Sequence, residues 1–148
     1  MGYQPEGKVT RLPRERIAGE ALPFYRIIKE GTGANAGKYF LCDAGEVPVG
    51  LTIPSEDGYR WDDTNKAMVK RINYPINEYP EGIIEGIGYV ELAETVSPGQ
   101  ICVAAADGKG AGNDSPLTAL TAGELAVGIG RFIDGGDAND IVRVKLSI

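Results

Sequence analysis

Turn-forming segments divide this chain into short pieces. It contains 21 glycines and 9 prolines among 148 residues, and three segments gather glycine with aspartate or asparagine, namely 31–37, 107–114 and 134–137. Such residues tolerate positive φ angles or bond to their own backbone, so they favour turns. No window of twelve residues carries an apolar stripe with the helical period, and the best helical segment, 118–126, contains Gly123. We therefore do not expect a helical protein.

The pieces between the turns have the pattern of β-strands. In the last piece Val142, Val144, Leu146 and Ile148 occupy alternate positions, which is the period of a strand with one buried face. The other predicted strands are 22–29, 38–43, 47–53, 66–72, 83–92, 100–105 and 125–133. Residues 59–61 and 66–69 flank the polar segment 62–65, which predicts a hairpin with a four-residue loop. The fold class is therefore expected to be all-β, as a small β-barrel or a sandwich.

A short segment of the chain occurs twice. Residues 44–51 (AGEVPVGL) match residues 122–129 (AGELAVGI) at five of eight positions, with an offset of 78. At the same offset residues 24–25 fall on residues 102–103. The match predicts a repeated unit in which a turn leads into a strand, with a glycine where another backbone comes close. The alternative is a chance match, because short glycine-rich strings often resemble one another.

Length, charge and composition exclude several classes of protein. A chain of 148 residues is expected to form one domain, and its net charge of −6 argues against binding to nucleic acid or to anionic membranes. The longest apolar run, 101–106, is too short for a transmembrane helix. Histidine is absent, which excludes histidine-based zinc sites and catalytic triads. Cys42 and Cys102 lie within apolar stretches and are expected to be buried free thiols, with a disulfide as the alternative.

No segment carries a convincing catalytic, metal or cofactor site. Segment 31–37 lacks the helix that a dinucleotide-binding glycine motif requires, and segment 134–140 lacks the spacing of a calcium loop. The acidic pair Asp62 and Asp63 is expected at a solvated hairpin tip. We therefore expect no catalytic residues, no metal and no cofactor, with an enzyme of unrecognised type as the remaining alternative.

The N-terminal segment differs in charge from the rest of the chain. Residues 1–29 carry six basic and three acidic side chains, whereas residues 30–148 carry nine basic and eighteen acidic ones. The apolar residues of the first twenty follow no regular period. We predict an extended basic arm over 1–20, which orders on a partner and adds little to stability, followed by a single β-domain over 21–148. The alternative is a frayed terminus without a function.

A second segment has the composition of a protein interface. Tyr74-Pro75 and Tyr79-Pro80 repeat a Tyr-Pro pair at a spacing of five residues. Proline holds the backbone extended and removes a hydrogen-bond donor, and tyrosine is enriched among residues that dominate binding energy. The segment is predicted to contact a protein partner, whereas the alternative has both tyrosines capping the domain's own core.

The order of these features resembles the small capsid decoration, or head cement, proteins of tailed bacteriophages. In this chain a basic arm precedes an acidic β-domain, which carries the repeated segment 122–129 and ends on the strand at 140–147. The resemblance implies a β-tulip or similar barrel, homotrimers at the three-fold positions of a capsid, and no catalysis. It also implies a place on the outer surface of the virion after synthesis in the host cytoplasm, with the major capsid protein as partner. The insertion at 59–82 has no counterpart in the shorter members.

On this resemblance we assign two sets of contact residues. The predicted capsid-binding residues belong to the arm: Lys8, Val9, Arg11, Leu12, Arg14, Arg16 and Ile17. The predicted subunit interface is formed by Tyr74, Pro75, Tyr79 and Pro80. Two alternative functions remain: another β-module of a virion, and a small β-barrel that binds a ligand.

Overall fold

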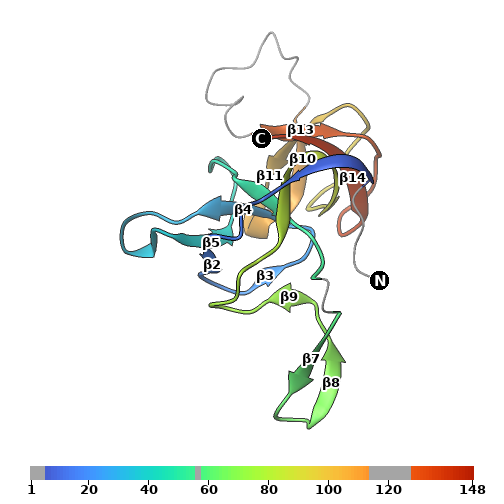
Figure 1. Cartoon of the computed structure of the whole chain (residues 1–148). Helices are drawn as coiled ribbons and strands as arrows, with labels where there is room; N and C mark the ends of the chain where they lie inside the picture. Colours follow the sequence, from blue (N-terminus) through green and yellow to red (C-terminus); the bar gives the residue numbers. More distant parts are fainter. Residues whose placement is uncertain (1–5, 56–57, 114–127) are drawn as a thin grey trace.

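The computed structural model describes residues 6–55, 58–113 and 128–148, and it confirms an all-β fold (Figure 1). The two helical elements in these ranges are short 3-10 turns, η1 (Gly33–Asn35) and η2 (Ala106–Gly108). The strands are β1 (Glu6–Arg11), β2 (Ile17–Ala18), β3 (Leu22–Pro23), β4 (Ile27–Glu30), β5 (Lys38–Leu41), β6 (Gly50–Thr52), β7 (Tyr59–Asp62), β8 (Ala67–Lys70), β9 (Asn73–Tyr74), β10 (Gly82–Glu91), β11 (Ile101–Ala104), β12 (Gly110–Asn113), β13 (Gly128–Phe132) and β14 (Ile141–Ser147). Within the described ranges no helix is long and apolar enough to span a membrane.

One ten-stranded sheet forms most of the molecule. Its strands follow the order β12-β11-β13-β14-β10-β6-β4-β5-β2, and β1 pairs with β10 beside this path. Two small sheets, β3–β9 and β7–β8, lie outside it. Leu92 bridges to Gly110 and brings the end of β10 back to β12, but a single bridge does not close the path. Over the residues described here the strands form an open, curled sheet and no closed barrel, so the sandwich-like alternative describes the fold better.

The strand order shows an internal repeat. In one half β4 pairs with β5 and β6, and β6 pairs with β10. In the other half β11 pairs with β12 and β13, and β13 pairs with β14. All these pairs are antiparallel, and the two halves join where β10 pairs with β14. The predicted duplication is therefore confirmed at the level of strand pairing.

The repeat has a different register from the one that the sequence match suggests. Gly50 pairs with Ile28 in the first half, and Gly128 pairs with Val103 in the second. Equating the two glycines places Val103 on Ile28, whereas the sequence offset places it on Tyr25. Tyr25 instead has a positive φ of 63° and lies in the turn between β3 and β4. The second copy of the turn, 122–127, and the possible helix at 118–126 lie outside the described residues.

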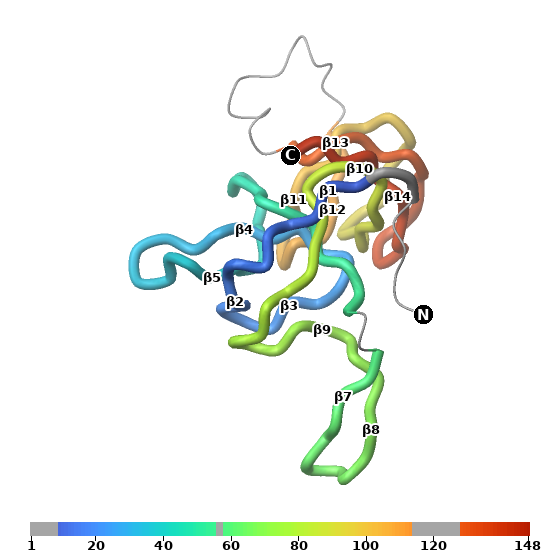
Figure 2. The backbone as a smooth tube through the Cα atoms, in the orientation of Figure 1, coloured from blue at the N-terminus to red at the C-terminus, as the bar shows by residue number. Residues whose placement is uncertain are grey.

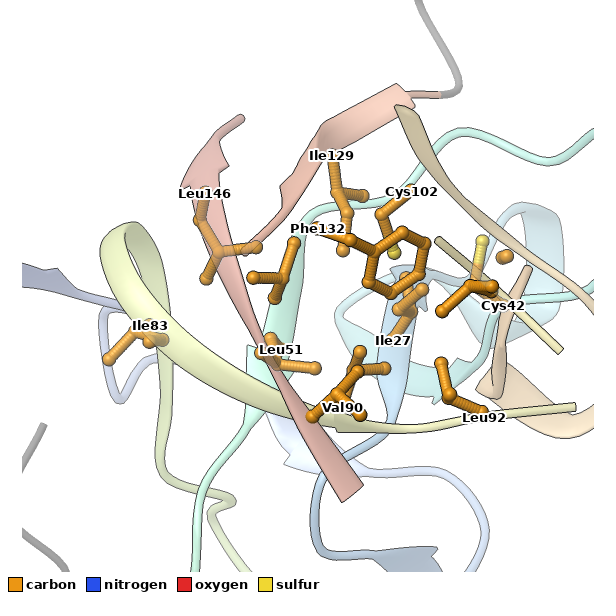
Figure 3. Packing of buried hydrophobic residues seen from close by; sticks show 14 of the residues in the cluster. Ile27, Cys42, Leu51, Ile83, Val90, Leu92, Cys102, Ile129, Phe132 and Leu146 are labelled. Atoms are coloured by element: carbon orange, nitrogen blue, oxygen red, sulfur yellow. The ribbon is translucent and has the colours of Figure 1, made fainter. Parts of the chain in front are cut away.

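Two clusters of apolar side chains form the interior. The larger one fills the curled sheet and includes Ile27, Leu51, Val90 and Phe132 (Figure 3). The alternation predicted for the last strand is confirmed, since Val142, Val144 and Leu146 are buried, although Ile148 lies beyond β14 and is exposed. The smaller cluster lies beneath β3 and β9 and consists of Leu12, Ala18, Leu22, Ile28, Tyr39 and Tyr74.

The N-terminal segment belongs to this fold, which corrects the prediction of a separate arm. β1 pairs antiparallel with β10, and the amide of Leu12 donates to the carbonyl of Gly82 at 2.9 Å. Leu12 is only 6% exposed, and Val9 packs against the larger cluster. β2 extends the pairing by lying parallel to β5. Few apolar side chains suffice here because β10 supplies an already formed strand for backbone pairing.

The glycine-rich segment 107–114 is predicted to be a turn, but half of it forms β12, and Asp107 and Gly108 belong to the 3-10 turn η2. Residues 110–113 pair with β11, and a Cβ on Gly110 would lie 3.3 Å from Val90 and 3.4 Å from the sulfur of Cys102. Glycine is used here because the strand packs closely against its neighbours, which is one of the recognised uses of glycine within sheets.

Both cysteines are free and buried, as expected. Burial raises the pKa of Cys42 to about 11 and that of Cys102 further still. Because the thiolate is the reactive form, we expect a thiol reagent at pH 8 to label the folded protein very slowly. In the unfolded, unreduced protein both thiols should react at once, which gives a count of two thiols per chain. Rapid labelling of the folded protein, or a count of zero after unfolding, would contradict this assignment.

Candidate interaction surface

The seven predicted capsid-binding residues do not form one exposed face. Val9 and Leu12 pack into the domain, and Ile17 is half-buried in β2. Arg14 lies 3.6 Å from Glu81, and Arg16 lies 3.0 Å from Glu30. The side chain of Lys8 lies outside the description. The basic side chains that remain largely exposed are therefore those of Arg11 and Arg14.

The Tyr-Pro segment is divided between the interior and the surface. Tyr74 is 2% exposed, donates its hydroxyl to the carbonyl of Ile53 at 2.6 Å, and meets Phe24 edge to face. Pro80 is buried as well. The assignment of these two residues to a subunit interface is corrected, because their side chains belong to the core of one copy. Tyr79 is half exposed, so its role in an interface stays a prediction.

The predicted hairpin is present and projects from the body (Figures 1 and 2). β7 and β8 pair with each other and with no other described strand. The backbone amide of Arg71 donates to the carbonyl of Gly58 at 2.9 Å and closes the base of the hairpin. The guanidinium of Arg71 also forms a two-pronged ion pair with Glu78, at 2.9 to 3.1 Å. The base of the hairpin is thus fixed to the body while its length extends into solvent.

One face of this hairpin is apolar. Tyr59 pairs with Lys70, and Trp61 pairs with Met68. Directly paired residues share a face of an antiparallel sheet, as do alternate residues along a strand. Tyr59, Trp61 and Met68 therefore point to the same side, and they are 62%, 54% and 60% exposed. The indole of Trp61 also donates to Asp63 at 3.1 Å, which helps to fix the ring.

This apolar face was not predicted from the sequence. The predicted features of this region were the hairpin, the acidic pair at its tip and the Tyr-Pro pairs that follow. The available signal was the alternation of Tyr59 and Trp61 with the charged residues Arg60 and Asp62. In a hairpin without a covering layer, such alternation exposes one apolar face whichever way the strands turn.

A concave acidic surface lies elsewhere on the molecule, beside β4 and β5. Its cavity has a volume of about 320 Å³, and Phe40 and Leu41 contribute apolar surface to it. Lys29 and five carboxylates complete the charged lining: Glu20, Glu30, Asp43, Glu46 and Asp107. We call this surface the acidic depression.

The acidic residues of the depression also bond within the molecule. Lys29 pairs with Glu46, and this contact together with the amide of Asp43 lowers the pKa of the Glu46 carboxyl. Glu20 accepts the amide of Leu41, and Asp43 accepts the amide of Asp107, both through a single oxygen. These three carboxylates are therefore held in place by the fold, and the bonds to Leu41 and Asp107 each use one oxygen of Glu20 and of Asp43.

Comparison with known proteins gives a match among solved structures. No family model matches the chain, and no curated protein matches it. Among solved structures it is similar to the N base of the head fiber protein gp8.5 of bacteriophage phi29, with a TM-score of 0.57. The match covers 95% of each chain at 11% sequence identity. At this identity the comparison shows a shared fold.

Proposed function

We propose that this chain is a structural protein of a bacteriophage head, which binds the outer surface of the shell as a decoration or cement protein. The observation that carries the proposal is the shared fold with the base of a head fiber, which extends over 95% of both chains. The resemblance of the sequence to head cement proteins supports the same place in the virion. In this role the chain binds the major capsid protein and catalyses no reaction.

We further propose that the protein acts as a trimer at three-fold positions of the capsid. The predicted shell contact holds two largely exposed cations, Arg11 and Arg14, and an exposed ion pair contributes about 0.2–1 kcal/mol. Linking three copies turns the second and third contacts into intramolecular ones, which raises the overall affinity without new contact types. Arg11 and Arg14 lie on and just after the N-terminal strand and are the exposed basic residues that we assign to the shell contact.

A ligand-binding barrel is the second class of function, and the packing favours it less. Apolar side chains fill the inside of the curled sheet (Figure 3). The acidic depression and a second depression of about 470 Å³ beside Arg71 are lined mainly by charged and polar side chains. Small-molecule sites are usually lined by apolar and aromatic side chains.

The proposal is tested by mixing the purified protein with undecorated capsids and imaging them by electron cryo-microscopy. We expect added density at three-fold positions on the outer surface. The double variant Arg11→Ala, Arg14→Ala should bind with reduced affinity and a weaker dependence on salt. A matched control with the same charge change, Arg131→Ala, Lys145→Ala, alters exposed residues of β13 and β14 and should bind normally. Capsids that stay bare at saturating protein would contradict the proposal.

A further inference from the structure

The structure points to a partner for the apolar face of the β7–β8 hairpin: we propose that it docks on a second copy of this chain, in the acidic depression. Only one part of this inference, the closure of the contacts into a trimer, rests on the proposed function. The contact between hairpin and depression follows from the surfaces themselves.

The hairpin is a structure that needs a partner. An isolated two-stranded hairpin is at best marginally stable in water, and it gains independent stability only from further strands or a packed face. Among the residues that the structure describes, β7 and β8 form backbone pairs only with each other, and the points that fix them to the body lie at the base of the hairpin. The apolar face of the hairpin is therefore exposed in a single copy. A short turn could have taken the place of the whole hairpin.

The exposed apolar area of the hairpin is large enough to indicate an interaction site. A fully buried aromatic side chain removes about 150–250 Å² from water, so Tyr59 and Trp61 at more than half exposure leave roughly 200 Å² open. Met68 on the same face adds to this area. A contiguous apolar patch of a few hundred Å² on a soluble protein commonly marks an interaction site.

Charge identifies the partner as a second copy of the chain. Residues 59–70 carry three basic and two acidic side chains, so the hairpin has a charge of +1 within a chain of net charge −6. Arg71 at its base is paired with Glu78 and is not counted. The remaining residues therefore carry −7. In the acidic depression five carboxylates face one lysine, although Arg16 also pairs with Glu30. A basic hairpin and an acidic depression have complementary potentials, which favours their association.

The shapes and apolar groups are complementary as well. The hairpin is a projecting element, and the depression is concave with Phe40 and Leu41 in its lining. Trp61 or Tyr59 can contact these apolar groups while Lys70, which pairs with Tyr59 and shares its face, approaches the surrounding carboxylates. An aromatic side chain that fills a pocket within a charged rim is the usual form of a strong protein contact.

The positions of the two surfaces determine the kind of assembly. The hairpin projects from the body on a different side from β4 and β5, where the depression lies (Figure 1). One copy can therefore give its hairpin to a neighbour while receiving another hairpin. Such head-to-tail contacts close into a ring when the rotation between copies allows it, and three copies would satisfy this condition in the proposed trimer.

Trp61 provides a direct measurement because it is the only tryptophan in the chain. We expect its fluorescence emission to move to shorter wavelength, and its quenching by iodide to fall, as the protein associates with rising concentration. Analytical ultracentrifugation of the same samples should show oligomers. The variant Tyr59→Ser, Met68→Ser keeps the probe and should weaken association at least tenfold. Its matched control, Ala67→Ser, Val69→Ser, changes the opposite face and should associate normally.

A second set of variants tests the depression. The triple variant Glu20→Gln, Asp43→Asn, Asp107→Asn removes three charges but keeps oxygen acceptors for the amides of Leu41 and Asp107. It should weaken association severalfold and reduce its dependence on salt. The control triple variant Glu85→Gln, Glu94→Gln, Asp137→Asn removes three exposed charges outside the depression and should not. Circular dichroism checks that all variants are folded.

The outcomes separate this inference from the proposed function. A wild-type protein that remains monomeric, with unchanged Trp61 emission at every concentration, overturns the inference even if it decorates capsids. A Trp61 shift that occurs only on adding capsids assigns the face to the shell, which also overturns the inference and supports the proposed function. Association that depends on the hairpin face and the depression supports the inference even if no capsid is bound.

Discussion

Deletion of residues 2–20 is expected to lower the free energy of unfolding by about 4 kcal/mol or more, which for many domains removes most of the stability. Removing the side chain of a buried leucine alone costs about 2–5 kcal/mol, and Leu12 is 6% exposed. The deletion also removes β1 from β10 and breaks the 2.7 Å hydrogen bond from the amide of Ala18 to the carbonyl of Glu78. Denaturant unfolding followed by circular dichroism measures the loss.

Two further variants test the cause. Leu12→Ala should reproduce a large part of the loss, whereas Arg11→Ala, which changes an exposed side chain of β1 and leaves Leu12 in place, should change stability little. If the protein lacking residues 2–20 unfolds like the wild type, the segment is an arm after all, and the pairing of β1 with β10 contributes nothing. Shell binding must be tested with point variants such as Arg11→Ala, because the deletion disturbs the fold.

This segment also shows where prediction from sequence stops. The alternation of Val142, Val144 and Leu146 identified β14 because a strand with one buried face has a local signature. β1 has no such signature, and its partner β10 begins about seventy residues later. The pairing depends on backbone groups of a distant strand, so local composition indicated only a basic, irregular segment.

Residue type did not determine which aromatic side chains are buried. Tyr74 lies beside a proline in a polar segment but fills the smaller cluster, with its hydroxyl satisfied by Ile53. Trp61 belongs to an alternating strand of ordinary appearance, yet it is more than half exposed. The difference depends on whether another layer covers the strand, which is a property of the whole fold. Both segments could be located from the sequence, but which of them is exposed could not be predicted.

The internal repeat was partly predictable for a physical reason. The glycine that opens β6 and the one that opens β13 each pair with the equivalent neighbouring strand, β4 or β11, so their context is retained in both halves. The loops that link the remaining strands differ in length between the two halves. An alignment without gaps therefore equates the wrong residues around Tyr25. Strand pairing showed the correct register, which no short motif could supply.

Gly130→Ala is expected to destabilise the protein by about 3 kcal/mol or more. Gly130 has a φ of +153°, a conformation that residues with a Cβ rarely adopt. An added Cβ would overlap the carbonyl oxygen of Lys145 and lie 2.8 Å from its carbonyl carbon. Because Gly130 pairs with Leu146 in β14, the clash forces apart two central strands. For a chain of this length the melting temperature should fall by about 6–12 °C, measured by differential scanning calorimetry.

Gly99→Ala is the matched control. Gly99 also has a positive φ, of +87°, but a Cβ there would meet no atom within 4 Å. Its substitution should cost only the conformational strain of a left-handed residue, about 1–2 kcal/mol. The difference between the two variants measures the contact with β14 together with the greater strain of a φ of +153° compared with one of +87°. An equal loss of unfolding free energy in the two variants would mean that β13 and β14 can separate at Gly130 without penalty. Their close pairing would then contribute little to the stability of the second half of the repeat.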